Sequence, residues 1–249
     1  MYHSVTFAYG NIGMNTWDDW KLIPASRPLF NPPKKKTNYI DIPGADSALD
    51  LSEVLTGFPL YNDREGTLEF IVENPTIPTW EQDGTDLWAK RYSDISSFLN
   101  GKKLTARLED DPTYYYKGTF ALDSWKSDKD RSRIVISYKL DPYKYKMTES
   151  QVTLGPNATI TLSGNNYLDM MPVVPKLTTS GGAFDMHFVN TELNIDFNYL
   201  MRTPGIYQPS DMIFSNLSGL INRQDCPVTV RITNSGAGSG VFKWRNGRL

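Results

Sequence analysis

The chain has 249 residues, one cysteine and a formal net charge of −2, from 26 basic and 28 acidic residues. This near balance of charge excludes the global basic field that many nucleic-acid-binding proteins present. The lone Cys226 excludes an internal disulfide and favours synthesis in a reducing compartment. No apolar run approaches the length of about 20 residues that crosses a bilayer, and the N-terminus lacks a secretory signal layout. We therefore expect a soluble protein without membrane insertion.

The first part of the chain predicts strands separated by proline-rich loop. Residues 4–7 alternate between polar and apolar side chains and lead to Gly10, as a strand would. Residues 15–36 contain four prolines and are expected to form ordered loop or edge strand. Residues 39–42 and 67–72 are the next expected strands, the first of them ending at a Pro-Gly turn.

Residues 87–99 predict an amphipathic helix. Four side chains recur at helical spacing and are expected to form one buried stripe: Trp88, Tyr92, Ile95 and Leu99. Asp86 is the expected N-cap, and Gly101 is the expected left-handed residue that closes the helix.

Three alternating strands follow the helix and predict a meander. They cover residues 104–108, 114–125 and 134–140, and an acidic turn with Pro112 separates the first two. Gly118 interrupts the second strand and indicates either a bulge or a close approach of backbones. Helix and meander together give an N-terminal β-sandwich or barrel with one flanking helix.

The second half predicts only short strands, separated by Asn, Gly, Ser and Pro. Such regular spacing is typical of a β-sandwich or jelly roll. The last two strands are joined by the glycine-rich residues 234–240, which we interpret as a hairpin tip. We therefore predict two domains, residues 1–146 and residues 147–249, in a mainly β chain.

The sequence contains no motif typical of a catalytic or metal-binding site. His3 and His187 are too few for a metal cluster. Glu109, Asp110 and Asp111 could supply paired carboxylates for acid and base catalysis, but neighbours on one turn seldom oppose each other across a cleft. We expect no enzymatic activity, no cofactor and no metal.

Aromatic residues are the remaining candidates for function. Tyr114 and Tyr116 share one face of a strand, and Tyr115 lies on the other, so at most one face can be core. Tyr and Trp are enriched where protein surfaces meet partners. Core packing and a subunit interface both remain open for this cluster, which also includes Trp125.

The region of residues 87–146 resembles the distal tail protein family of siphophages, the hub at the tip of a long non-contractile tail. The resemblance rests on FLNGKK, LEDDPTYYYKG, DSWKSDK and LDPYKYK, on IPGADSALDLSEVLTG with YNDREGTLEF upstream, and on the closing KWRNGRL. Asn100 stands where many relatives have His, and Ala45 where an Arg often follows the IPG motif.

The resemblance implies a tail-tube-like N-terminal domain that forms a hexameric ring, and a galectin-like C-terminal β-sandwich. The implied function is a structural hub of the virion tail tip, made in the host cytoplasm, that joins the tail tube to the adhesion apparatus and lets DNA pass. Implied partners are five in kind: further copies of the chain, the tail tube protein, the tail-associated tip protein, the tape measure protein and receptor-binding proteins.

Two hypotheses assign residues to this role. Tyr114, Tyr115, Tyr116 and Trp125 are candidate subunit-interface residues, and Glu109, Asp110 and Asp111 are candidate lumen-facing acids that discourage DNA from sticking. The alternative function is a carbohydrate- or receptor-binding module, in which Trp244, Phe242 or Tyr207 stacks on a sugar.

Overall fold

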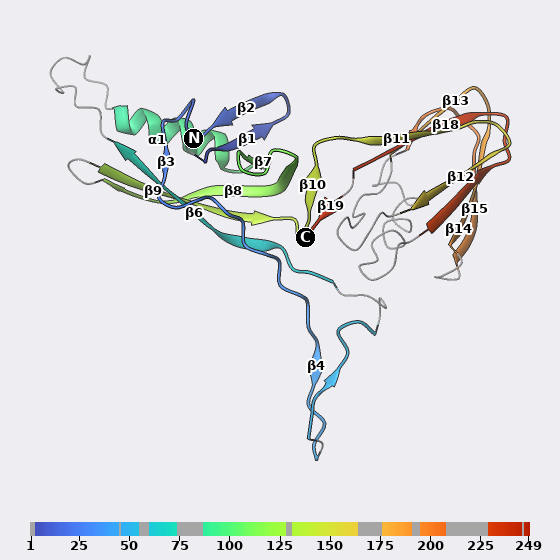
Figure 1. Cartoon of the computed structure of the whole chain (residues 1–249), viewed down its shortest axis with the longest axis horizontal. Helices are drawn as coiled ribbons and strands as arrows, with labels where there is room; N and C mark the ends of the chain where they lie inside the picture. The colour runs from blue at the N-terminus through green and yellow to red at the C-terminus, as the bar shows by residue number, and fades with distance from the viewer. Residues whose placement is uncertain are drawn as a thin grey trace. The chain divides into compact units, whose positions relative to one another are not determined.

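The computed structural model describes residues 3–44, 46–54, 60–73, 87–127, 131–163, 176–190, 195–207, 229–245 and 247–249. The chain divides into two compact units (Figure 1). Unit 1 comprises residues 1–36 and 61–144, and unit 2 comprises residues 37–60 and 145–249. Strand β10 (Lys144–Lys146) lies at the point where the chain passes between them. The predicted functional domains, 1–146 and 147–249, stay a prediction.

Unit 1 is built on an antiparallel sheet with the strand order β2-β1-β7-β8-β9-β6-β3. Its strands are β1 (Val5–Tyr9), β2 (Ile12–Asn15), β3 (Ile23–Pro24), β6 (Arg64–Glu73), β7 (Lys103–Leu108), β8 (Tyr114–Ser127) and β9 (Arg131–Leu140). Helix α1 (Leu87–Leu99) lies across one face of the sheet (Figure 1). The mainly β fold with one helix beside the sheet is thus confirmed.

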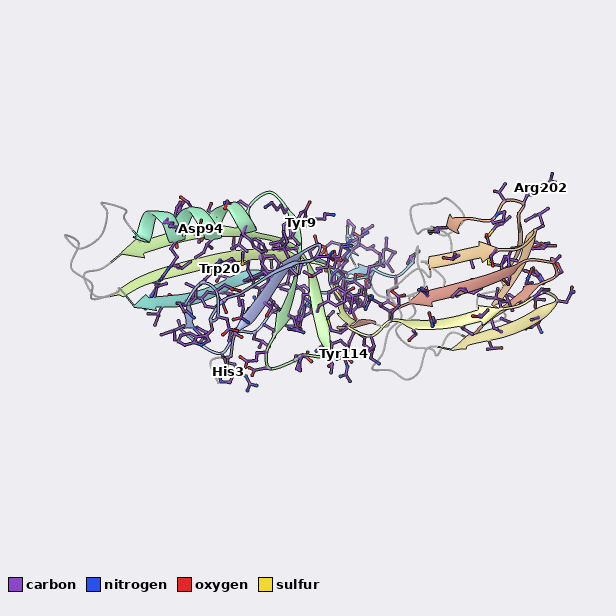
Figure 2. The ribbon with its side chains drawn as sticks, turned by 90° about the horizontal axis from the view of Figure 1, so that it is seen from above. His3, Tyr9, Trp20, Asp94, Tyr114 and Arg202 are labelled. Carbon is purple, nitrogen blue, oxygen red and sulfur yellow. The ribbon has the colours of Figure 1, made fainter. Side chains whose placement is uncertain are left out.

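Alternating side chains of the sheet form the core on the face that the helix covers. Leu104, Ala106 and Leu108 of β7 are buried, as their spacing of two predicts. Trp20 lies beside the helix (Figure 2), with its ring centroid 5.8 Å from that of Phe98. The segment between β2 and β3, which carries the buried Trp20 and Leu22, therefore helps to close the core.

The helix stripe was predicted only in part. Ile95 and Leu99 are fully buried, but Tyr92 is 45% exposed. Phe98 packs partly against the core instead, because it is three residues after Ile95 and so shares its face. Gly101 has φ +76° and ends the helix as expected. Asp86 and the side chain of Trp88 lie outside the described residues.

Gly118 marks a close approach of backbones, and the bulge of β8 lies elsewhere. A Cβ atom at Gly118 would come within 2.1 Å of the Lys139 carbonyl oxygen on β9. The register of β8 against β9 shifts between Leu122 and Ser124. The Asn100 side chain accepts a hydrogen bond from the Leu122 amide at 3.1 Å there, so the helix end is tied to the bulge.

Residues 37–60, which we call the arm, contain a short hairpin. Strand β4 (Tyr39–Ile40) pairs with β5 (Leu49–Asp50), Tyr39 opposite Asp50 and Ile40 opposite Leu49. Gly44 has φ +86°, which suits the turn expected after Pro43. The predicted strand over residues 39–42 is therefore present over its first two residues.

The rest of unit 2 contains two four-stranded antiparallel sheets, with the orders β11-β18-β13-β16 and β12-β17-β14-β15. Their strands are β11 (Ser150–Leu154), β12 (Ala158–Ser163), β13 (Lys176–Ser180), β14 (Phe184–Asn190), β15 (Ile195–Met201), β16 (Ile206–Tyr207), β17 (Thr229–Asn234) and β18 (Ser239–Trp244), and β19 (Gly247–Arg248) follows. Phe184 and Phe242, one from each sheet, are buried with ring centroids 6.1 Å apart. The predicted C-terminal β-sandwich is confirmed.

The interpretation of residues 234–240 as a hairpin tip is wrong. Strands β17 and β18 belong to different sheets, so this segment crosses from one layer of the sandwich to the other. The buried Asn234 side chain donates to the Gly238 carbonyl at 2.7 Å and accepts from the Gly236 amide at 2.9 Å. A Cβ at Gly236 would approach the Ala183 carbonyl oxygen to 2.2 Å, so the glycine permits close packing of the two backbones.

Among the described residues, no helix is long and apolar enough to cross a membrane.

We expect Gly118→Ala to lower the free energy of unfolding by about 1–3 kcal/mol, because the added methyl group meets backbone atoms of β9. Urea unfolding measures this change. Gly155→Ala is the control, since no atom lies within 4 Å of its Cβ position, and it should change stability by less than about 0.5 kcal/mol. Wild-type stability of Gly118→Ala would contradict the close approach.

Candidate assembly surfaces

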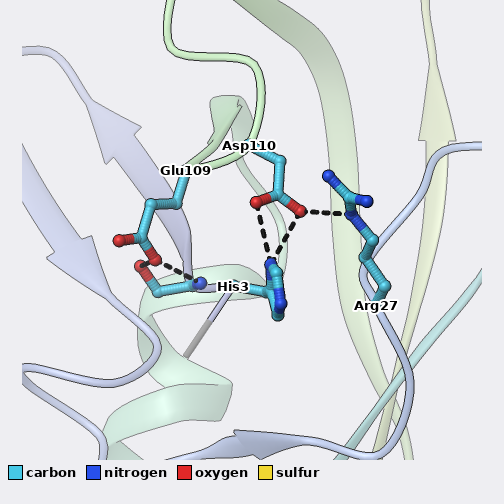
Figure 3. A network of polar contacts seen from close by, with 5 residues as sticks. His3, Arg27, Glu109 and Asp110 are labelled. Carbon is cyan, nitrogen blue, oxygen red and sulfur yellow. Dashed lines mark hydrogen bonds and ion pairs between the residues drawn. The ribbon is translucent and has the colours of Figure 1, made fainter. Parts of the chain in front are cut away.

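The acidic turn after β7 fastens the start of the chain to the sheet (Figure 3). The Glu109 carboxylate accepts hydrogen bonds from the Ser4 amide at 2.9 Å and from the Ser4 hydroxyl at 3.1 Å. The Glu109 amide in turn donates to the Ser4 carbonyl at 2.9 Å. These bonds hold the pKa of Glu109 below its usual value, with the backbone amide of Ser4 as the largest cause.

Asp110 binds the side chains of two other segments. Nδ1 of His3 lies 2.8 and 2.9 Å from its two carboxylate oxygens, and Nε of Arg27 donates to it at 2.6 Å (Figure 3). The hydrogen bonds from His3 and then Arg27 lower the pKa of Asp110. Asp111 accepts from Nζ of Lys144. Each of the three candidate lumen acids thus has a partner within unit 1.

Of the three tyrosines at the start of β8, Tyr116 belongs to the core, and its assignment to an interface needs correction. Tyr116 is only 5% exposed, and its ring centroid lies 4.5 Å from that of Phe30. Burial also raises the pKa of Tyr116. Tyr114 and Tyr115 are half-buried, and Nζ of Lys144 lies 4.5 Å from the Tyr114 ring centroid. Their role at an interface stays a prediction.

The other aromatic candidates are Trp125, assigned to the subunit interface, and the residues assigned to sugar stacking, which are Trp244, Phe242 and Tyr207. The backbone of Trp125 pairs with Ile134, but its side chain lies outside the described part of the structure, as do those of Trp244 and Tyr207. Phe242 is fully buried between the sheets of the sandwich. It therefore cannot stack on a sugar, and the alternative function loses that residue.

Arg64 was missed by the sequence reasoning, although it joins three segments of unit 1. Arg64 is only 4% exposed, and its guanidinium donates to the carbonyls of Pro142 at 2.8 Å and Asn31 at 2.9 Å. It also lies 5.5 Å from the Tyr116 ring centroid. No described carboxylate pairs with it, and burial lowers its pKa. A single arginine within a strand gives no signal in sequence that it is buried.

The same segments close the base of the arm. Lys35 bridges to Tyr61, and the Asn62 amide donates to the Lys34 carbonyl at 2.8 Å. The ring centroid of Tyr61 lies 6.4 Å from that of Tyr143. Residues 34–36 and 61–64, which flank the arm on both sides, are thus held together within unit 1.

The arm presents apolar side chains to solvent. Six of them are between 37% and 68% exposed: Tyr39, Ile40, Ile42, Leu49, Val54 and Leu60. An isolated two-stranded hairpin is marginal in water and has no second layer on which to bury such groups. Sequence reasoning recognised the strand but not this exposure, which depends on what the tertiary structure places against the hairpin. Among the described residues, no group of three His, Cys, Asp or Glu side chains is placed to hold a metal ion.

The lowered pKa values of Glu109 and Asp110 make the fold sensitive to acid. A carboxyl with a lower pKa in the folded than in the unfolded chain stabilises the fold above its unfolded pKa, and this contribution is lost as the pH falls through the folded pKa. We expect stability to decrease between about pH 5 and pH 2, and Asp110→Asn to flatten that decrease. Urea midpoints at stepped pH measure it. Asp94→Asn, on the exposed side of helix α1 (Figure 2), should keep the wild-type slope; an unchanged slope for Asp110→Asn would contradict this role.

Arg64→Ala should destabilise unit 1 by about 2–4 kcal/mol, because two buried carbonyls lose a charged donor. Arg133→Ala is the matched control, since its ion pair with Glu69 at 2.8 Å is exposed; it should cost less than about 1 kcal/mol. Thermal unfolding of both variants checks the difference, and equal losses would refute the anchoring role of Arg64.

No protein-family model and no curated protein matches the sequence. Solved structures do match. One is the crystal structure of the Dit protein of phage SPP1, described as a paradigm of the hub adsorption apparatus in phages that infect Gram-positive bacteria. The similarity covers 97% of this chain and 98% of that one, with a TM-score of 0.59 and 13% sequence identity. The resemblance to distal tail proteins is therefore confirmed at the level of the fold, which this chain shares with SPP1 Dit along nearly its whole length.

Proposed function

We propose that the chain is the structural hub of a siphophage tail tip, a homohexameric ring that joins the tail tube to the host-adhesion apparatus and lets DNA pass. The observation that carries this proposal is the shared fold with SPP1 Dit over 97% of the chain. The tail motifs of the sequence, concentrated between residues 87 and 146, support it independently. In this role the protein acts in the virion by assembly and requires no catalytic step.

The exposed arm supports self-assembly. A closed cyclic ring repeats one heterologous contact, so each subunit needs two different and complementary surfaces. The arm is one such surface, because its apolar side chains gain from burial against another chain. Its base is fixed within unit 1 by Arg64 and by the pairing of Lys35 with Tyr61. A fixed base reduces the entropy that docking would cost.

Other parts of the proposal follow from the resemblance. The partners are the tail tube protein, the tail-associated tip protein, the tape measure protein and the adhesion proteins, with DNA present only in transit. Tyr114 and Tyr115 remain candidates for the subunit interface. Glu109, Asp110 and Asp111 remain candidates for the lumen, although their pairing with His3, Arg27 and Lys144 weakens the field that they could present.

The native mass tests the ring. We expect six copies of the 28.2 kDa chain by light scattering, and a stable monomer at all concentrations would refute the ring. The double variant Ile40→Ser/Leu49→Ser removes the apolar pair that faces across the hairpin. It should shift the mass toward the monomer without lowering the unfolding temperature of the subunit, because both side chains are already exposed. Leu200→Ser, an equally exposed leucine of β15, is the control and should keep the ring.

A further inference from the structure

The outer face of the sheet β12-β17-β14-β15 in unit 2 (Figure 1) carries polar side chains in two cross-strand rows. Phe184, Met186 and Ile232 are buried between the two sheets, so the residues that alternate with them point outward. In the order from β12 to β15, the first row consists of Thr159, Thr233, His187 and Asn198, and the second of Thr161, Arg231, Val189 and Asp196. We call these residues the polar face. Each row is about 14 Å long, because neighbouring strands lie about 4.8 Å apart.

Two side chains of the polar face are available to a ligand. Asn198 and Arg231 are exposed, and neither side chain forms a hydrogen bond or an ion pair in the described part of the structure. Their backbones are fixed by strand pairing, Asn198 opposite His187 and Arg231 between Thr161 and Val189. The amide and the guanidinium are therefore hydrogen-bonding groups carried at fixed positions on paired strands.

The other groups of the polar face add hydrogen-bond acceptors. Nε2 of His187 lies 2.6 Å from one carboxylate oxygen of Asp196, which leaves the second oxygen of Asp196 and Nδ1 of His187 for a ligand. The hydroxyl oxygens of Thr159 and Thr233 lie 2.9 Å apart, and each keeps a lone pair. Donors and acceptors thus lie side by side on this face.

The composition of the polar face argues against three classes of partner. Nucleic acid requires clustered cations, whereas Arg231, the one arginine of the two rows, is offset by Asp196. In the described residues, no three His, Cys, Asp or Glu side chains are placed to hold a metal ion. A protein interface usually has aromatic or apolar anchors at its centre, but Val189 is the one apolar member of the two rows.

A neutral sugar matches these groups, because each sugar hydroxyl both donates and accepts hydrogen bonds. We infer that the polar face binds a neutral oligosaccharide, with Arg231 and Asn198 donating to its hydroxyl oxygens and Asp196 accepting from its hydroxyl groups. Rows of about 14 Å suit a chain of sugar rings better than a single ring. Tyr207 and Trp244, which the sequence suggested for sugar stacking, belong to strands of the other sheet, so this site is a different one. The inference adds a ligand to the proposed hub and does not depend on ring formation.

A glycan array tests the inference. Fluorescently labelled full-length protein, applied to printed neutral and anionic oligosaccharides of bacterial surfaces, should bind neutral members of the array. Asn198→Ala and Arg231→Ala should each weaken that binding by about tenfold or more, because a sugar hydroxyl loses its partner. Gln151→Ala, which removes an exposed amide from the other sheet, and Arg202→Ala (Figure 2) are the matched controls and should bind as the wild type does. All four variants should keep the native mass and the unfolding temperature of the wild type, since the replaced side chains are exposed.

Chemical modification of histidine locates the bound glycan independently of the variants. The chain has two histidines, His3 and His187, and both side chains are 42% exposed. The neutral glycan that gives the strongest array signal should protect His187 from diethyl pyrocarbonate and leave His3 unprotected, as mass spectrometry will show.

Four results would overturn the inference. They are no binding to neutral glycans, binding only to anionic ones, undiminished binding by either Asn198→Ala or Arg231→Ala, and protection of His187 no greater than that of His3. Any of these together with a six-copy native mass would leave the proposed hub intact. A monomer that binds neutral glycans through the polar face would instead refute the ring and support the inference.

Discussion

The buried guanidinium of Arg64 is the contact on which the arrangement of unit 1 depends. It binds Asn31 before the arm and Pro142 before the passage to unit 2, while Arg64 itself begins the strand that follows the arm. A buried cation without a carboxylate partner is costly, and here carbonyl oxygens and the face of Tyr116 offset that cost. One side chain thereby fixes the points at which the chain leaves and re-enters the sheet. The arm and the C-terminal sandwich are both attached at these points.

The three carboxylates of the acidic turn stabilise unit 1 by binding other segments of the same subunit. Glu109, Asp110 and Asp111 each contact a different segment, and together they fasten residues 3 and 4, the loop at Arg27 and the end of unit 1 at Lys144. Each of these carboxylates is therefore already bound to a group of the same subunit. In the proposed ring, the field that DNA meets would depend more on unpaired charges elsewhere on the sheet than on this turn.

Unit 1 and the arm differ in how far their apolar side chains are covered. The core face of the unit 1 sheet is closed by the helix and the loop around Trp20. On the opposite face, β6 and β9 carry the ion pairs Glu65–Lys139 and Glu69–Arg133. The arm carries exposed apolar side chains. In the proposed ring, a heterologous contact would bury these side chains.

The sequence by itself determined the elements whose signal is local. The strand β7, the end of helix α1 at Gly101 and the turn at Gly44 follow from side-chain period and from the backbone freedom of glycine. Contacts between distant segments decided the rest. Tyr116 is core because Phe30 lies against it, Gly118 is required because β9 passes close by, and residues 234–240 cross between sheets because Asn234 is buried between glycine backbones. Burial, pairing and exposure depend on what the fold places opposite each residue, and only the tertiary structure supplies that.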